Sequence, residues 1–357
     1  MSTDFKETMT SAERFAAAVS GKPYDRIPVH LLISDHAARV LGVTVGEYES
    51  SATLMARGQA EAFRKYGHDV VNVGPGLTGI PEALGCRIGL PDGSPFVAEP
   101  AVRTEKDAAR LKVPDPHRDA RLPLFLEAAV LLRHTLGNEA VISMTTSGPF
   151  TTAAHVRGTD QFLRDLRRDP PFVHRILRVA TESIIAFARA AAEVGVRISL
   201  ADPTASGTMI AATQFREFAL PYLTEVVTAV KEATGGPPAL HICGNTSKIW
   251  REMADTGAGV LSLDNVIDLA EAKAAAGDRA PLLGNIHPTE VMYLGKPHEV
   301  RANAAKCLAK AWDTPKGYVL GLGCGLPIDT PPENILALVD AAREYGRWPL
   351  DPERFAQ

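Results

Sequence analysis

The chain has 357 residues, of which 45% are hydrophobic and 22% are charged, as expected for a globular protein with a large core. Its 38 basic and 42 acidic residues leave a net charge of −4, which excludes a broad basic field for nucleic acid and a polybasic patch for membranes. No apolar run reaches the ~18 residues that a membrane span needs, the N-terminus lacks a signal peptide's apolar stretch, and four cysteines are too few for a disulfide framework. These features predict a soluble, cytoplasmic protein.

Apolar, β-branched runs recur along the chain and are typical of buried strands. The predicted strands are Ile27–Leu32, Val70–Gly74, Ala140–Ser147, Val196–Asp202, Ala239–Cys243, Gly259–Asp264, Pro281–Ile286 and Tyr318–Gly323.

Amphipathic stretches lie between these runs and predict helices. The predicted helices include Val45–Tyr66, Pro170–Val194, Thr213–Thr234, Ser247–Thr256, Val266–Ala276, His298–Trp312 and Pro332–Tyr345. Thr213 and Thr330 precede two of the helical patterns and are expected to cap them, because a threonine oxygen can accept a free N–H of the first turn.

Eight strands that are each followed by a helix predict a (β/α)8 TIM barrel with a parallel core, formed by a single domain over residues 1–357. The alternative is an open doubly wound sheet. No G-x-G-x-x-G follows the first strand to mark a dinucleotide crevice, and the glycines of residues 321–325 have the wrong spacing. The pattern therefore favours the barrel.

Residues 75–118 interrupt the alternation of strands and helices. They are rich in proline and glycine and show little periodicity, which predicts a long loop insertion over the mouth of the barrel. A small hairpin is expected around Pro91-Asp92-Gly93. Long loops of this kind are usually lids or binding segments.

Three soft ligands stand out: His241 and Cys243 in A-L-H-I-C-G, and Cys324 in L-G-L-G-C-G-L-P. Residues two apart on a strand face the same side, so His241 and Cys243 can bind one ion together. One imidazole and two thiolates suit Zn²⁺, and three protein ligands leave the open position of a catalytic site. The alternative is that these cysteines are small core residues, as we expect for Cys86 and Cys307.

Three acidic residues lie near the ends of predicted strands. Asp202 and Asp264 end their strands, where the reactive residues of a barrel lie, and are candidate catalytic groups. Asp202 could instead form a turn before Pro203, and Asp264 could cap a helix. Asp69 precedes its strand and either starts it or points a carboxylate into the mouth.

Asn285 and His287 lie at the end of the seventh predicted strand and are candidate cofactor-binding residues. Asn285 could instead hydrogen-bond only to loop backbone, and His287 could be a surface histidine. Asp202, Asp264 and His287 are also candidates to occupy the open metal position until a substrate displaces them.

Several segments resemble the uroporphyrinogen decarboxylase superfamily, whose members have a (β/α)8 barrel. The matching stretches are A-D-P-T-A-S-G-T-M-I (201–210), F-R-E-F-A-L-P-Y-L (215–223), G-V-L-S-L-D-N (259–265), L-G-N-I-H-P-T-E-V-M (283–292) and G-L-G-C-G-L-P-I-D-T-P-P-E-N (321–334).

The ligand residues distinguish two branches of that superfamily. Decarboxylases carry an arginine pair after R-x-P-V-W and a histidine in place of Cys324, and have no metal. Here Arg26-Ile27-Pro28-Val29 is followed by His30 without that pair, although a substrate with eight carboxylates needs several arginines. His241, Cys243 and Cys324 match the H-x-C…C zinc pattern of the branch of methylcobamide:coenzyme M methyltransferases.

The resemblance implies a zinc-dependent methyltransferase that moves a methyl group between a methylcobamide corrinoid and a small thiol such as coenzyme M, in either direction. The chain lacks the D-x-H-x-x-G of a cobalamin module, so we expect a separate corrinoid protein as partner. Arg39, Arg87 and Asn285 are candidates, by position alone, to bind a sulfonate. The alternatives are a decarboxylase-like lyase, methyl transfer to tetrahydrofolate, and a non-catalytic protein that binds a corrinoid protein.

Overall fold

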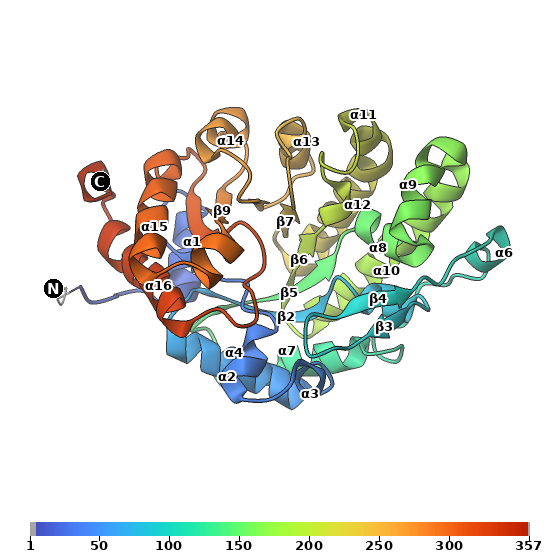
Figure 1. Cartoon of the computed structure of the whole chain (residues 1–357), viewed down its shortest axis with the longest axis horizontal. Coiled ribbons are helices and arrows are strands. Elements are labelled where there is room, and N and C mark those ends of the chain that lie inside the picture. Colours follow the sequence, from blue (N-terminus) through green and yellow to red (C-terminus); the bar gives the residue numbers. More distant parts are fainter. Residues whose placement is uncertain (1–4, 356–357) are drawn as a thin grey trace.

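Eight parallel strands form the centre of the computed structural model, which describes residues 5–355 (Figure 1). Their order, β1-β10-β9-β8-β7-β6-β5-β2, is that of a nearly closed barrel, which confirms the predicted (β/α)8 fold. The strands are β1 (Val29–His30), β2 (Val70–Gly76), β5 (Val141–Ser147), β6 (Arg197–Ala201), β7 (Ala239–Ile242), β8 (Val260–Leu263), β9 (Leu282–Ile286) and β10 (Tyr318–Leu322).

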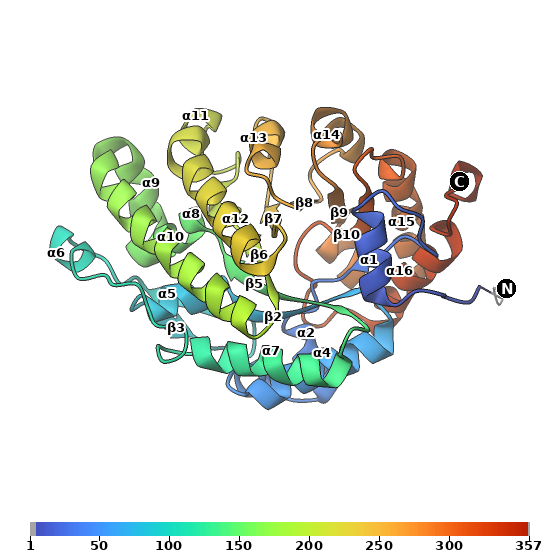
Figure 2. The same ribbon diagram turned by 180° about the vertical axis from the view of Figure 1, so that it is seen from behind.

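The helices surround these strands, as the two opposite views show (Figures 1 and 2). Leucine, isoleucine and valine side chains on the outer face of the barrel are buried beneath them. The helices outside the insertion are α1 (Ser11–Ala18), α2 (His36–Leu41), α3 (Val45–Glu49), α4 (Ala52–Tyr66), α7 (Leu122–Leu136), α8 (Pro149–Arg157), α9 (Thr159–Arg168), α10 (Pro170–Glu193), α11 (Ala212–Gln214), α12 (Leu220–Thr234), α13 (Trp250–Asp255), α14 (Leu269–Ala276), α15 (Pro297–Ala311) and α16 (Pro332–Tyr345).

Two predicted helices are interrupted. The stretch Val45–Tyr66 is divided into α3 and α4, because the Ser51 hydroxyl accepts the Leu54 N–H and starts a second helix. The stretch Thr213–Thr234 contains a π-helical segment, Phe215–Ala219, between α11 and α12.

The two predicted threonine caps were wrong. Helix α11 begins at Ala212, one residue before Thr213, and the Gln214 side chain accepts the N–H of Ala211. At α16 the capping position is held by Pro331, and the Thr330 hydroxyl donates to the carbonyl of Pro327 instead. Neither threonine oxygen caps the first turn of its helix, which the sequence spacing alone does not reveal.

The insertion 75–118 holds two short helices, α5 (Gly79–Ala83) and α6 (Glu105–Ala108), and the predicted hairpin, formed by antiparallel strands β3 (Arg87–Gly89) and β4 (Phe96–Glu99). It extends to one side of the barrel in Figure 1. The hairpin turn is fixed to α2 and α3. Asp92 accepts hydrogen bonds from Arg39 and from the Val45 N–H, and the Ser94 hydroxyl donates to Asp35 at 2.8 Å.

Helix α1 closes the amino-terminal end of the barrel interior. Phe15 and Val19 pack against Val260, Leu283 and Val319, which form a separate apolar cluster near the starts of their strands. The interior is therefore filled with hydrocarbon at this end, and polar groups can be accessible only toward the carboxyl ends of the strands.

Asp69 lies fully buried where β1 meets β2. Its carboxylate accepts hydrogen bonds from Arg14 at 2.5 Å, from Arg26 at 2.7 Å and from the Val29 N–H at 2.7 Å. Its own N–H donates to the Val29 carbonyl at 2.9 Å. The structure thus places Asp69 at the amino end of β2, away from the mouth of the barrel. Of the two roles that the sequence left open, starting the strand or pointing into the mouth, Asp69 has the first.

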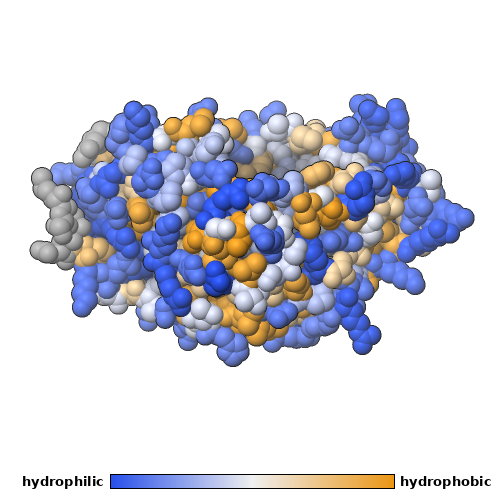
Figure 3. All heavy atoms as spheres, turned by 60° about the horizontal axis from the view of Figure 1, so that its bottom comes forward, coloured by the Kyte–Doolittle hydropathy of each residue, from blue (hydrophilic) through white to orange (hydrophobic). Residues whose placement is uncertain are grey.

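A helix that crosses a membrane has to be both long and apolar. Within residues 5–355, no helix combines the length and the apolar character that a bilayer crossing requires. Apolar patches on the face drawn in Figure 3 are interrupted by hydrophilic side chains.

Replacing Asp69 by alanine should lower the free energy of unfolding by about 3–5 kcal/mol, because it leaves buried arginine charge without its acceptor. The measurement is a urea unfolding curve. The control is Asp313→Ala, which removes a half-exposed partner of Lys273 and should cost less than about 1 kcal/mol. An equal loss of unfolding free energy in the two variants would contradict the structural importance of Asp69 and its bonds to Arg14 and Arg26.

Candidate metal centre

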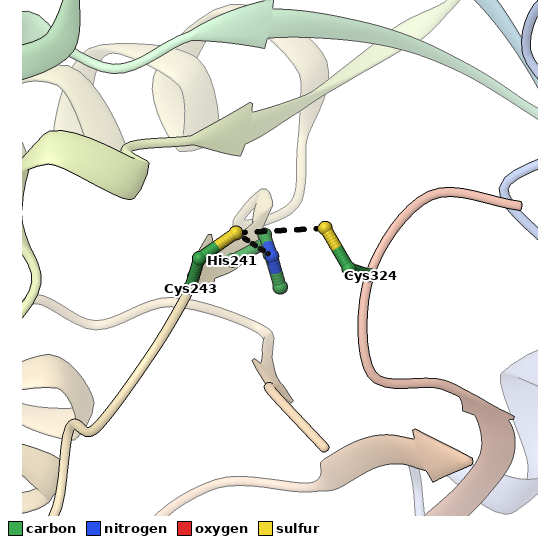
Figure 4. A group of neighbouring side chains, drawn as sticks. All are labelled: His241, Cys243 and Cys324. Atoms are coloured by element: carbon green, nitrogen blue, oxygen red, sulfur yellow. Dashed lines mark hydrogen bonds between the residues drawn. The ribbon is translucent and has the colours of Figure 1, made fainter. Parts of the chain in front are cut away.

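Three predicted ligands converge at the carboxyl ends of β7 and β10 (Figure 4). His241 and Cys243 come from β7 and the residue that follows it, and Cys324 comes from the loop after β10. The Nε2 atom of His241 lies 2.9 Å from the Cys243 sulfur, and the two sulfurs are 3.6 Å apart. All three ligand atoms lie within 4.8 Å of one another.

This arrangement fits a tetrahedral zinc ion. Zn–S bonds of about 2.3 Å place two sulfur ligands about 3.8 Å apart, close to the separation found. The Nε2–sulfur separation is shorter than the roughly 3.5 Å of such a site, so the ring and the Cys243 thiol would move slightly apart around an ion. Two soft thiolates and an imidazole are a donor set that zinc prefers over magnesium or calcium.

A serine that the sequence reasoning missed orients the histidine. The Nδ1 atom of His241 lies 3.0 Å from the Ser262 hydroxyl, which leaves Nε2 directed at the two sulfurs. Ser262 is the register partner of His241 on the neighbouring strand β8. Its position as a polar residue within the apolar run V-L-S-L was the available signal. Such partners fix the tautomer and orientation of a metal-binding histidine.

The thiols of Cys243 and Cys324 differ in pKa. The hydrogen bond from Cys243, assisted by one from His241, lowers the pKa of Cys324 below the ordinary thiol range. The same hydrogen bond, together with burial, raises the pKa of Cys243. The pair therefore carries one thiolate readily, and a cation is needed for both to be deprotonated.

Asp264 holds the turn that follows Cys243. Its carboxylate accepts the Gly244 N–H at 2.7 Å and the Val266 N–H at 3.0 Å. Gly244 has a φ of +71°, a left-handed conformation that favours glycine. Asp264 thus fixes the loop that carries one candidate ligand. It does not cap the following helix, which was its structural alternative, because α14 begins at Leu269 and is capped by Asp268.

Asp202 is fully buried at the start of α8. It accepts the Thr151 N–H at 2.6 Å and the Phe150 N–H at 3.3 Å, and its own N–H donates to the His241 carbonyl at 2.8 Å. Burial raises the pKa of Asp202 to about 6. The side chain thus caps the first turn of α8 from a distant segment, and the catalytic role expected for Asp202 stays a prediction.

The side chains of the two candidate cofactor-binding residues, Asn285 and His287, form hydrogen bonds with nearby backbone groups. The Asn285 amide donates to the carbonyls of Asp264 and Ile267, at 2.9 and 2.7 Å, as its structural alternative predicted. His287 caps the segment Pro288–Tyr293 by accepting two backbone N–H groups through Nδ1. Neither belongs to the group of ligand atoms within 4.8 Å.

The four cysteines should differ in reactivity in metal-free protein. Cys243 and Cys324 are partly exposed, whereas Cys86 and Cys307 are buried. A thiol reagent such as 5,5′-dithiobis(2-nitrobenzoate) should therefore modify a fast pair and a slow pair. The Cys243→Ser, Cys324→Ser double variant should lack the fast phase. A fast phase that persists in this variant would contradict the burial of the other two thiols.

Asp202 should make the protein less stable as the pH rises. Its folded pKa of about 6 lies above the unfolded value of about 3.9, so the folded state binds the extra proton and stability falls between pH 4 and pH 6. Relative to Asp202→Asn, which does not titrate, the wild type should lose about 2–3 kcal/mol of unfolding free energy over this window. Urea unfolding of both proteins at several pH values measures the difference, and a constant difference would contradict the raised pKa.

Known proteins match the chain over nearly its whole length. The model of the uroporphyrinogen decarboxylase (URO-D) family matches residues 10–345. The methylcobamide:CoM methyltransferase MtaA of Methanosarcina barkeri is 32% identical, with 94% of this chain and 98% of that protein covered. The methylcobamide:CoM methyltransferase MtbA of Methanosarcina acetivorans is 31% identical with the same coverage.

A solved structure agrees with these relatives. A methyltransferase from Methanosarcina mazei superposes with a TM-score of 0.86 at 29% identity and covers 94% of this chain and 99% of its own. The barrel and the sequence comparisons thus lead to the same group of proteins. The chain belongs to the uroporphyrinogen decarboxylase family, and within it the chain resembles the methylcobamide:CoM methyltransferases.

Proposed function

We propose that the protein is a zinc-dependent methyltransferase that moves a methyl group between a corrinoid and a thiol such as coenzyme M. The observation that carries the proposal is the meeting of His241, Cys243 and Cys324 within 4.8 Å at the carboxyl end of the barrel. Relatives named as methylcobamide:CoM methyltransferases support the same chemistry.

The chemistry requires a soft, deprotonated sulfur nucleophile. A free thiol is mostly protonated at pH 7, because its pKa is about 8.5. His241, Cys243 and Cys324 would hold the zinc ion, which would lower the pKa of a substrate thiol and leave its sulfur electron-rich. As the sulfur–carbon bond forms, the cobalt–carbon bond breaks, the electron pair stays on cobalt, and the thiol proton goes to solvent.

The charge of the candidate ligands favours a thiol over water as the activated group. Two thiolates cancel the charge of a Zn²⁺ ion, whereas three neutral histidines would leave it strongly positive and suited to making hydroxide. Ser262 and Asp264 hold His241 and the Cys243 turn in place, so the ligand set is ordered by the protein itself.

A separate corrinoid protein would present the methyl group at the mouth of the barrel. The insertion 75–118 is our candidate for a docking or gating element. Its hairpin carries exposed apolar side chains at Leu90 and Phe96, and the hairpin turn is anchored by Asp92 and Ser94. Exposed apolar groups on a fixed scaffold are suited to a protein interface.

The alternatives have less support in the geometry. A metal-free decarboxylase-like mechanism would need Asp69 in the mouth, but this carboxylate is bonded to Arg14 and Arg26 at the other end of β2. Methyl transfer to tetrahydrofolate uses a nitrogen nucleophile and gives less reason for two thiolate ligands.

The first test is zinc content, measured by elemental analysis on protein purified without chelator. About one zinc per chain is expected in the wild type, and almost none in Cys324→Ala, because two remaining ligands bind zinc weakly. Cys86→Ala is the matched control, since it removes a buried thiol outside the site and should keep the metal.

Zinc-loaded wild type should then transfer the methyl group of methylcobalamin to coenzyme M, and Cys324→Ala should be slower by roughly a hundredfold or more. The rate is followed by the absorbance change of the corrinoid. Absence of zinc from the wild type, or full activity in Cys324→Ala, would refute the proposed function.

A further inference from the structure

Four polar side chains form a hydrogen-bonded chain across neighbouring strands on the inner side of the barrel. Nε2 of His30 lies 3.1 Å from the Asn72 oxygen, the Asn72 amide donates to the Thr145 hydroxyl at 3.2 Å, and the hydroxyls of Thr145 and Ser199 are 3.0 Å apart. These residues come from β1, β2, β5 and β6. We refer to His30, Asn72, Thr145 and Ser199 as the polar chain.

The polar chain faces the accessible interior beside the metal ligands. Along β6 and β7, Leu200, Leu240 and Ile242 are buried beneath the helices, and the residues that alternate with them keep partial exposure. Ser199 is one of these, and so is His241. Ser199 lies two residues before Ala201, which is the register partner of His241, so the chain reaches the strand next to the ligands.

Hydrogen-bonding capacity is left over in this chain. Thr145 and Ser199 have two hydroxyl protons but make one bond to each other, so one O–H remains for a ligand. Nδ1 of His30 has no partner among residues 5–355. Burial lowers the pKa of His30 to about 4, so the ring is neutral at pH 7. The chain thus offers both a donor and an acceptor.

No member of the polar chain is a cation. Arg39 and Arg87, which the sequence suggested for binding a sulfonate, already pair with carboxylates: Arg39 with Asp92 and Asp329, and Arg87 with Glu99. An anion removed from water without a cationic partner costs several kcal/mol.

We propose that the polar chain binds the head group of the thiol substrate and selects an uncharged hydroxyl or amide over a sulfonate. This inference rests on the proposed function, because the sulfur end of the substrate is assigned to the site of His241, Cys243 and Cys324. It departs from the anionic coenzyme M named for the relatives, and replaces charge recognition by neutral hydrogen bonds.

Three thiols with one carbon skeleton test the selectivity: 2-mercaptoethanol, 2-mercaptoethanesulfonate (coenzyme M) and ethanethiol. Their dissociation constants for the zinc-loaded protein are measured by titration calorimetry without a methyl donor. We expect 2-mercaptoethanol to bind about fivefold tighter than ethanethiol, as one or two neutral hydrogen bonds provide, and about tenfold tighter than the sulfonate.

Ser199→Ala should reduce the preference for 2-mercaptoethanol over ethanethiol by about threefold or more, because it removes one hydroxyl of the chain. Thr228→Ala is the matched control, since it removes an exposed hydroxyl on α12 and should keep the wild-type preference. Zinc content is measured for every variant, so that a change in binding is not confused with loss of metal.

Tighter binding of the sulfonate than of 2-mercaptoethanol, an unchanged preference in Ser199→Ala, or binding of none of the three thiols would overturn the proposal. A separate assay of methyl transfer from methylcobalamin distinguishes the two hypotheses. Selective binding without methyl transfer would support the head-group site and refute the methyltransferase function. Methyl transfer with a preference for the sulfonate would support the methyltransferase function and refute the head-group site.

Discussion

The buried carboxylate of Asp69 joins the two strands at which the barrel has to close. Its side chain accepts the Val29 N–H, and thereby takes the place of a main-chain bond between β1 and β2. Arg14 and Arg26 neutralise it and connect the closure to α1, whose Phe15 and Val19 fill the interior below. Removing these charges from water costs free energy, and this cost is offset only because each charge has a close partner of opposite sign. Loss of one partner therefore leaves another buried charge uncompensated.

Closure gives the metal centre its geometry. Parallel strands end at one rim of the barrel, so residues at the carboxyl ends of β7 and β10 can face one another across the interior. The thiols of Cys243 and Cys324 then lie 3.6 Å apart, a spacing at which only one ionises easily. The fold thus brings together ligands that repel each other once charged, which is the condition under which a divalent cation is bound tightly.

The strands and the candidate ligands could be predicted from the sequence because their signals are local. Each strand is a short apolar run, and the pair His241 and Cys243 is separated by one residue on such a run. The roles of Asp202 and Asp69 could not be predicted from the neighbouring sequence. Both carboxylates accept hydrogen bonds from segments distant in sequence, at Thr151 and at Arg14, and a strand-end aspartate looks the same whether it contacts a ligand or a helix. Ser262 was missed because the register between β7 and β8 is a tertiary property.

The pairing of β1 with β10 has a consequence for how the protein is made. The first strand leaves the ribosome long before its neighbour, and an open parallel sheet exposes unpaired edges until the last strand arrives. Because Cys324 lies 81 residues after Cys243, the nascent protein passes through a stage in which Cys243 is present without Cys324. An ion that needs all three candidate ligands can therefore be bound only after Cys324 has been synthesised.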